Sequence, residues 1–137
     1  MRVKVRGRPD LVERFGVQWT PTHLVLDADG VERDRIEGFL PADDLVPRLQ
    51  LALAKLAFEK KHYAEAERRH RAVCERHPRS GSAPEACYWA GVAAYQRDHE
   101  ARHLAETAEQ LARRHPTSEW TRKASVWMPR HESHPAR

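Results

Sequence analysis

The chain has 137 residues with a formal net charge of +4; 40% of its residues are hydrophobic and 32% are charged. This composition is typical of a globular protein with one compact domain or two very small ones. No stretch approaches the roughly 20 apolar residues of a membrane span, and the N-terminus lacks the apolar core of a secretion signal. We therefore expect no membrane association and a cytoplasmic location.

The charge is distributed unevenly along the chain. Residues 1–50 carry 8 basic and 9 acidic side chains, whereas residues 51–128 carry 14 and 10. In the basic part the signs mostly alternate, as in EKKHYAEAERRHR, which is typical of a solvated helix face. Aromatic residues are not interleaved with the basic ones in the sequence, as stacking on a nucleic-acid strand would need. A nucleic-acid partner is therefore disfavoured.

The first part of the chain alternates between strand and helix signals. Val3 to Val5 is predicted to form a short strand. Pro9 to Phe15 is predicted to form a helix, because proline favours a helix start and Gly16 favours its end. The apolar run from Thr22 to Leu26 then predicts a buried strand.

A hairpin and a second helix follow. Asp27 to Gly30 is a turn signal with glycine at the left-handed position, and Val31 to Ile36 is predicted to return as an antiparallel strand ending at Gly38. A helix is predicted from Pro41 to Leu53, with two aspartates in its first turn. Its apolar residues share one face: Leu45, Val46, Leu49 and Leu53.

This order of elements resembles the thioredoxin-like family over residues 3 to about 53. The resemblance is carried by Phe15-Gly16-Val17 at the helix end and by Thr20-Pro21-Thr22 before the hydrophobic strand. It implies a partial thioredoxin-like α/β sheet in which Pro21 is a cis-proline. It also implies that Thr20 offers backbone hydrogen bonds to an extended peptide, so Trp19, Thr20 and Pro21 are candidate peptide-binding residues. The alternative is that Pro21 only shapes the loop and Trp19 fills the core.

The chemistry of that family needs a reactive thiolate and a second thiol to resolve the mixed disulfide. Its paired cysteines, a CxxC motif, lie upstream of the matched segment and are not in this sequence. The two cysteines present, Cys74 and Cys87, are 13 positions apart in apparent helices. Buried free thiols are the favoured interpretation, although the two could meet across a helix hairpin. We expect no catalytic residue and no cofactor.

The family's central strand is missing together with the CxxC motif. Three explanations stay open: the sequence is a fragment or a mis-started reading frame, the remaining strands pair differently, or a second copy supplies the strand in a homodimer.

Residues 54–128 contain an internal repeat. The stretch from Glu75 to Ser80 recurs from Arg113 to Ser118 at an offset of 38, which also relates Trp89 to Trp127. A period of this length is typical of stacked helical hairpins. The resulting fold class is a partial α/β sheet plus all-α hairpin repeats, mainly helical overall. The predicted domains are 1–53, 54–128 and a flexible tail at 129–137.

The hairpins resemble tetratricopeptide repeats. Ala54, Ala66 and Pro78 have the family's spacing, and Tyr88 to Gly91 resembles its first helix, although the interval from Gly91 to Leu104 is one residue too long. The resemblance implies a groove that binds a peptide or a partner's helix. The candidate groove residues are Tyr88, Tyr95, Gln96 and Arg97, with Lys55 and Glu59 from the first hairpin; for the tyrosines, ordinary packing between repeats is the alternative.

Nine histidines raise the possibility of a metal site. His99 and His103 could share a face with Asp98 and Glu106, but no third histidine is fixed beside them, so we expect no metal. The sequence therefore favours a non-catalytic protein-interaction or scaffold module with a protein or peptide partner. The alternative is the C-terminal part of a thiol-disulfide oxidoreductase whose CxxC segment lies upstream.

Overall fold

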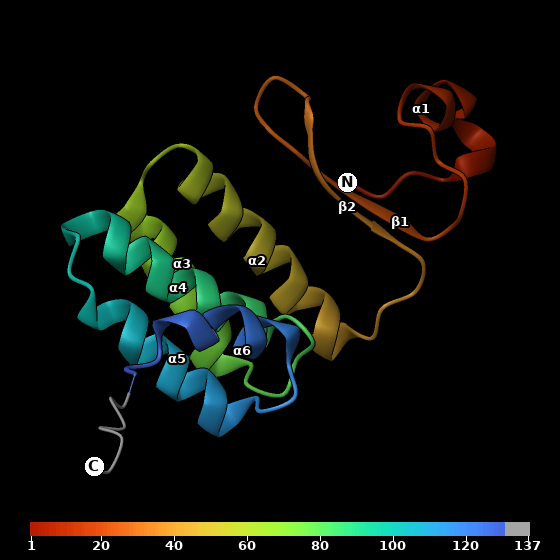
Figure 1. Cartoon of the computed structure of the whole chain (residues 1–137). Helices are drawn as coiled ribbons and strands as arrows, with labels where there is room; N and C mark the ends of the chain where they lie inside the picture. Colours follow the sequence, from red (N-terminus) through yellow and green to blue (C-terminus); the bar gives the residue numbers. More distant parts are fainter. Residues whose placement is uncertain (131–137) are drawn as a thin grey trace, which may run out of the picture. The chain divides into compact units, whose positions relative to one another are not determined.

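The computed structural model describes residues 1–130 of the chain and divides it into two compact units, Met1–Pro41 and Ala42–Arg137. The described residues form six α-helices and one two-stranded antiparallel sheet (Figure 1). This confirms the predicted fold class, a mainly helical protein with a small α/β part. None of the helices described is long and apolar enough to cross a membrane. The predicted tail falls, from residue 131 on, outside the described residues.

The first unit begins with a short 3₁₀ turn and a helix. The turn is η1 (Val5–Gly7) and the helix is α1 (Pro9–Arg14), which starts at its proline and is followed by Gly16 with a φ of 57°. The strand predicted at Val3 to Val5 is wrong. An isolated strand leaves its backbone groups unpaired, and the described strands of this unit pair only with each other.

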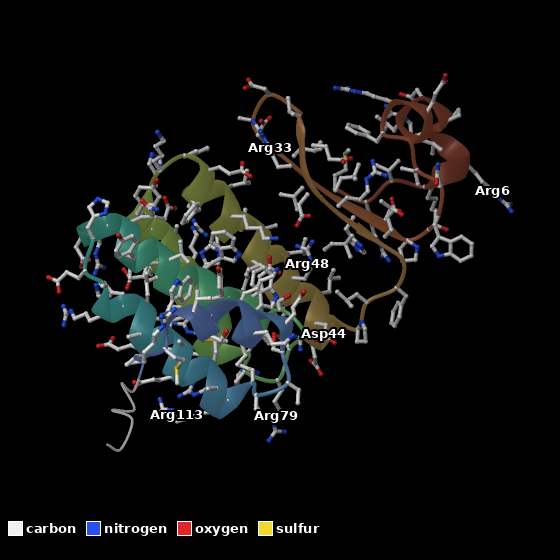
Figure 2. All side chains as sticks on the ribbon, viewed as in Figure 1. Arg6, Arg33, Asp44, Arg48, Arg79 and Arg113 are labelled. Atoms are coloured by element: carbon white, nitrogen blue, oxygen red, sulfur yellow. A yellow bond between two sulfur atoms is a disulfide. The ribbon has the colours of Figure 1, made fainter. Side chains whose placement is uncertain are left out.

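The hairpin of the first unit forms as predicted. Strand β1 (Thr22–Leu26) pairs antiparallel with β2 (Glu32–Glu37), with an irregularity between Val25 and Leu26. Asp27 organises the turn: its Oδ1 accepts the backbone N–H groups of Val31 and Asp29, which hold the pKa of Asp27 below its usual value. Its Oδ2 accepts from Arg33 (Figure 2). Gly30 takes the left-handed φ of 78° that the turn requires.

The second unit is a stack of helical hairpins. Each helix packs on the next one along the chain, and α4 also contacts α2 and α6 (Figure 1). The elements are α2 (Ala42–Glu59), α3 (Tyr63–Arg76), α4 (Ala83–Asp98), α5 (Arg102–Arg114), α6 (Glu119–Ala124) and η2 (Ser125–Trp127). Helix α2 runs without a break through residues 53 and 54, where the domain boundary was predicted; that boundary stays a prediction.

Helix α2 begins with an acidic turn that also ties the helices together. Asp44, labelled in Figure 2, accepts the backbone N–H of Gly81 at 3.0 Å through its Oδ1. Two residues of the predicted apolar face, Val46 and Leu53, are 48% and 46% exposed. The helix instead turns Leu51 and Ala54 into the core.

Small side chains let the helices of the second unit approach closely. The core contains Leu51, Val73 and Leu111 among many alanines. Gly91 on α4 faces Thr107 on α5 so closely that a Cβ added to it would lie 1.9 Å from Thr107 Oγ1. Thr107 is therefore the residue of α5 that packs against Gly91.

Cys74 on α3 and Cys87 on α4 form a disulfide, so the favoured interpretation of two free thiols is wrong. The pairing of the cysteines depends on how the helices pack. Helices α3 and α4 pack against each other and bring the two Cα atoms to 5.0 Å, within the range that a disulfide spans. The cysteines are 1% and 2% exposed, in the middle of the core.

Candidate functional site

The first candidate site is the loop before β1. The Thr20–Pro21 peptide bond is cis, as the resemblance implied. The loop is held at both ends: the Pro21 carbonyl accepts the N–H of Gly38 at 2.8 Å, and the Thr22 hydroxyl donates to the Trp19 carbonyl. Trp19 is 68% exposed, so it does not fill the core. Together with Val17, Gln18 and Thr20 it lines an open cavity of about 230 Å³.

This loop lines an open cavity but brings no reactive group. Both cysteines of the sequence lie in the helical unit, and both sulfurs are bonded to each other. A thiolate is what attacks in thiol exchange, and a buried disulfide offers none. The loop can therefore contribute backbone hydrogen bonds and an indole surface to a bound peptide. It does not contribute the thiolate that thiol exchange needs.

The second candidate site is a row of aromatic rings on the helical unit. We call it the aromatic row, and its members are Phe58, Tyr63, Tyr88, Trp89, Trp120 and Trp127. They come from α2, α3, α4, α6 and η2, and all six are half-buried. Each ring is therefore anchored in the unit while part of it stays open to solvent.

The rings form a continuous chain of contacts. Phe58 meets Tyr63 and Trp89 edge-to-face, with centroids 5.3 Å apart in each case. Tyr88 lies 5.4 Å from Trp89 and 5.1 Å from Trp120, and it stacks on Trp127 at 4.8 Å with an interplanar angle of 27°. Such pairs contribute roughly 0.5–1.5 kcal/mol beyond their buried area. The six rings of the row are thus joined by direct ring–ring contacts.

Local structure explains how each end of the row is positioned. At one end, Lys61 takes a left-handed φ of 62° that ends α2 and returns the chain into α3 at Tyr63. At the other end, the Ser118 hydroxyl caps α6 by accepting the N–H of Trp120 at 3.1 Å. The Lys123 ammonium then lies 4.0 Å from the centroid of the Trp120 ring, a favourable cation–π position.

The predicted groove residues are only partly brought together. Tyr88 belongs to the aromatic row. Tyr95 instead meets the ring of His99 edge-to-face at 5.6 Å. Arg97 makes ion pairs with Glu67 on α3 and with Asp98, and the two carboxylates raise the pKa of its guanidinium.

Sequence reasoning missed Phe58, Tyr63 and Trp120 as members of this surface. Trp127 was visible as the repeat partner of Trp89, 38 residues earlier. No comparable signal marks these three. Phe58 and Trp120 contact residues of α4 about 30 positions away in the chain, and Tyr63 joins the row through Phe58.

A buried histidine lies at the junction of α2, α3 and α4. His70 is 1% exposed; its Nδ1 bonds to the Ala66 carbonyl at 2.8 Å, and its Nε2 has no hydrogen-bond partner within the described residues. Burial lowers the pKa of His70 to about 4, with smaller opposing effects from the Ala66 carbonyl and Glu85. Lys55 and Glu85 form an ion pair nearby at 2.9 Å. His70 is therefore neutral at physiological pH.

Of the residues considered for a metal site, His103 and Asp98 come together but His99 points elsewhere. His103 Nε2 contacts Asp98 at 2.8 Å, while His99 turns to Tyr95. The Glu100 backbone N–H and His103 hold the pKa of Asp98 well below its usual range. Within residues 1–130, no three histidine, cysteine, aspartate or glutamate side chains gather in a way that could hold a metal ion.

Comparison with known proteins bears on the first unit. Residues 5–53, which are 49 of the 137 residues, match the family model of a thioredoxin-like domain. No curated protein and no solved structure matches the chain at a significant level. The tetratricopeptide resemblance of residues 54–128 therefore stays a prediction. Residues 5–53, by contrast, are related to the thioredoxin superfamily.

Proposed function

We propose that this chain is a protein-interaction module whose helical unit binds a partner and whose thioredoxin-like part does not catalyse thiol exchange. The observation that carries the proposal is the aromatic row. Half-buried aromatic side chains held in fixed positions are the residues that contribute most to protein interfaces, and stacked hairpins present them along a continuous surface.

The non-catalytic half of the proposal is supported by the cysteines. Cys74 and Cys87 are bonded to each other in the core, so neither can attack a substrate disulfide. The second candidate function is the C-terminal part of a thiol-disulfide oxidoreductase with its CxxC segment upstream. The family match of residues 5–53 and the exposed loop at Trp19, Thr20 and Pro21 favour this second candidate.

Two measurements test the first proposal on this chain, and an in-frame CxxC segment upstream of it would decide for the second candidate. In an insulin-reduction assay with dithiothreitol, the chain is expected to give no turnover above the reductant alone, and clear turnover would overturn the non-catalytic assignment. In parallel, the whole chain is screened against an immobilised library of random peptides. A set of specific ligands supports the interaction function, and the absence of any ligand would remove it.

Location and oligomeric state also belong to this proposal. The sequence led us to expect a cytoplasmic protein. Structural disulfides persist mainly in oxidising compartments, so the Cys74–Cys87 disulfide favours an oxidising compartment instead. A homodimer that supplies the missing strand predicts twice the monomer mass in light scattering, and a monomer of 15.9 kDa would exclude it.

A further inference from the structure

Each lysine of the helical unit lies within three positions, along the chain, of a ring of the aromatic row. The unit contains four of the five lysines in the sequence, Lys55, Lys60, Lys61 and Lys123, and the fifth is Lys4. Lys55 precedes Phe58 by three residues on α2, and Lys60 and Lys61 lie between Phe58 and Tyr63. Lys123 lies over the Trp120 ring. Positive charge is therefore placed at both ends of the row.

Much of this charge is not compensated. Lys55 is paired with Glu85, whereas Lys123 and Glu119 are 4.0 Å apart and both about half exposed, a geometry that binds weakly. Within residues 1–130, Lys60 and Lys61 have no ion-pair partner at all. Three glutamates within four positions of a ring of the row, Glu65, Glu67 and Glu85, are each already paired with another cation.

Lys61 occupies a position that favours glycine. Its φ of 62° ends helix α2, and at such helix ends glycine avoids the steric cost of a side chain. A lysine here is thus less stable than glycine would be, while it adds a cation beside the first rings of the row.

The ring geometry distinguishes between two kinds of partner. Nucleobases need open ring faces on which to stack. Here Tyr88 and Trp127 stack on each other, and Lys123 covers Trp120. The exposed parts of the half-buried rings suit the side chains of an extended peptide, because proline-rich segments dock on aromatic side chains.

From these observations, and resting on the interaction function proposed above, we propose that the aromatic row binds an extended acidic peptide. Proline or aliphatic side chains of the peptide contact the rings, and its carboxylates pair with Lys60 and Lys61 at one end and with Lys123 at the other.

The test is fluorescence polarisation of the whole chain with labelled peptides. The probe has a core of alternating proline and leucine with glutamates at both ends, and its matched control has glutamines in their place. We expect the glutamate peptide to bind about 10-fold more tightly at low salt, as the loss of several exposed charge pairs predicts, and the difference to shrink as salt rises. Equal affinities would overturn the proposal.

Variants locate the binding surface. The double variant Lys60→Glu and Lys61→Glu is expected to remove the preference for the glutamate peptide. The same change at the adjacent pair Arg113→Glu and Arg114→Glu, on α5 (Figure 2), is expected to keep it, because α5 contributes no ring to the row. Loss of the preference in both double variants would overturn the proposal, since net charge alone would then explain it.

A further variant separates binding from folding. Lys61→Gly is expected to raise the unfolding midpoint while weakening the glutamate peptide about threefold, a combination that a purely structural role does not produce. Tighter binding of a thymidine oligonucleotide than of any peptide would also overturn the proposal. If the peptide library yields ligands that none of these variants affects, the proposed interaction function stands and this site does not.

Discussion

The Cys74–Cys87 disulfide is expected to stabilise the helical unit strongly. It closes a loop of about 14 residues, since the two cysteines are 13 positions apart. In the chain-entropy model, a loop of this size lowers the entropy of the unfolded chain enough to stabilise the fold by about 3 kcal/mol. Reduction should therefore lower the free energy of unfolding of the helical unit by about that amount.

The assay is urea unfolding of the oxidised and the reduced chain, followed by far-ultraviolet circular dichroism because the helical unit carries most of the helix. With a denaturant slope of roughly 1.5 kcal/mol/M for a unit of this size, the midpoint should fall by about 2 M on reduction. Because both cysteines are almost fully buried, reduction of the native chain should be slow and should accelerate in denaturant.

Two controls make the test decisive. Maleimide labelling under denaturing conditions should find no free thiol before reduction and two after it. The double variant Cys74→Ala and Cys87→Ala should unfold close to the reduced wild type and should not respond to reductant. Equal midpoints for the oxidised and reduced chains, or two free thiols in the purified native protein, would refute the reasoning.

Three further perturbations test the packing of the helical unit. Between pH 6.5 and about 4, the unfolded chain binds a proton at His70 while the folded chain does not, so the free energy of unfolding should fall by about 3 kcal/mol as pH drops through this window. Chemical denaturation of the variant His70→Leu should show a flatter pH dependence of stability, and an unchanged dependence would contradict the assignment. Gly91→Ala should lower the free energy of unfolding by about 2 kcal/mol, because the added Cβ meets Thr107. Gly81→Ala, with open space around the added Cβ, should change stability little, and similar losses for both variants would contradict the close approach of α4 and α5. Asp44→Ala should lower the free energy of unfolding by about 1 kcal/mol through the lost hydrogen bond from Gly81. Asp44→Asn keeps an acceptor and should retain most of that stability, as measured by urea unfolding.

Elements whose causes are local could be predicted from the amino-acid sequence alone. Gly30 and Gly16 take the left-handed conformations that their neighbours predicted, and the hairpin and the short first helix end close to the predicted positions. The cis bond at Pro21 and the thioredoxin-like match of residues 5–53 also agree with what the motifs implied. Turn and cap preferences act over a few residues, so they can be predicted from a single sequence.

Tertiary structure decided the features that join distant residues. The strand expected at Val3 to Val5 does not form, because a strand depends on a partner that its own residues cannot specify. The pairing of Cys74 with Cys87, and the contact of Gly91 with Thr107, depend on how helices pack. The aromatic row is the clearest case, since its rings are scattered in the sequence and only the stacking of the helices brings them, and the lysines beside them, onto one surface.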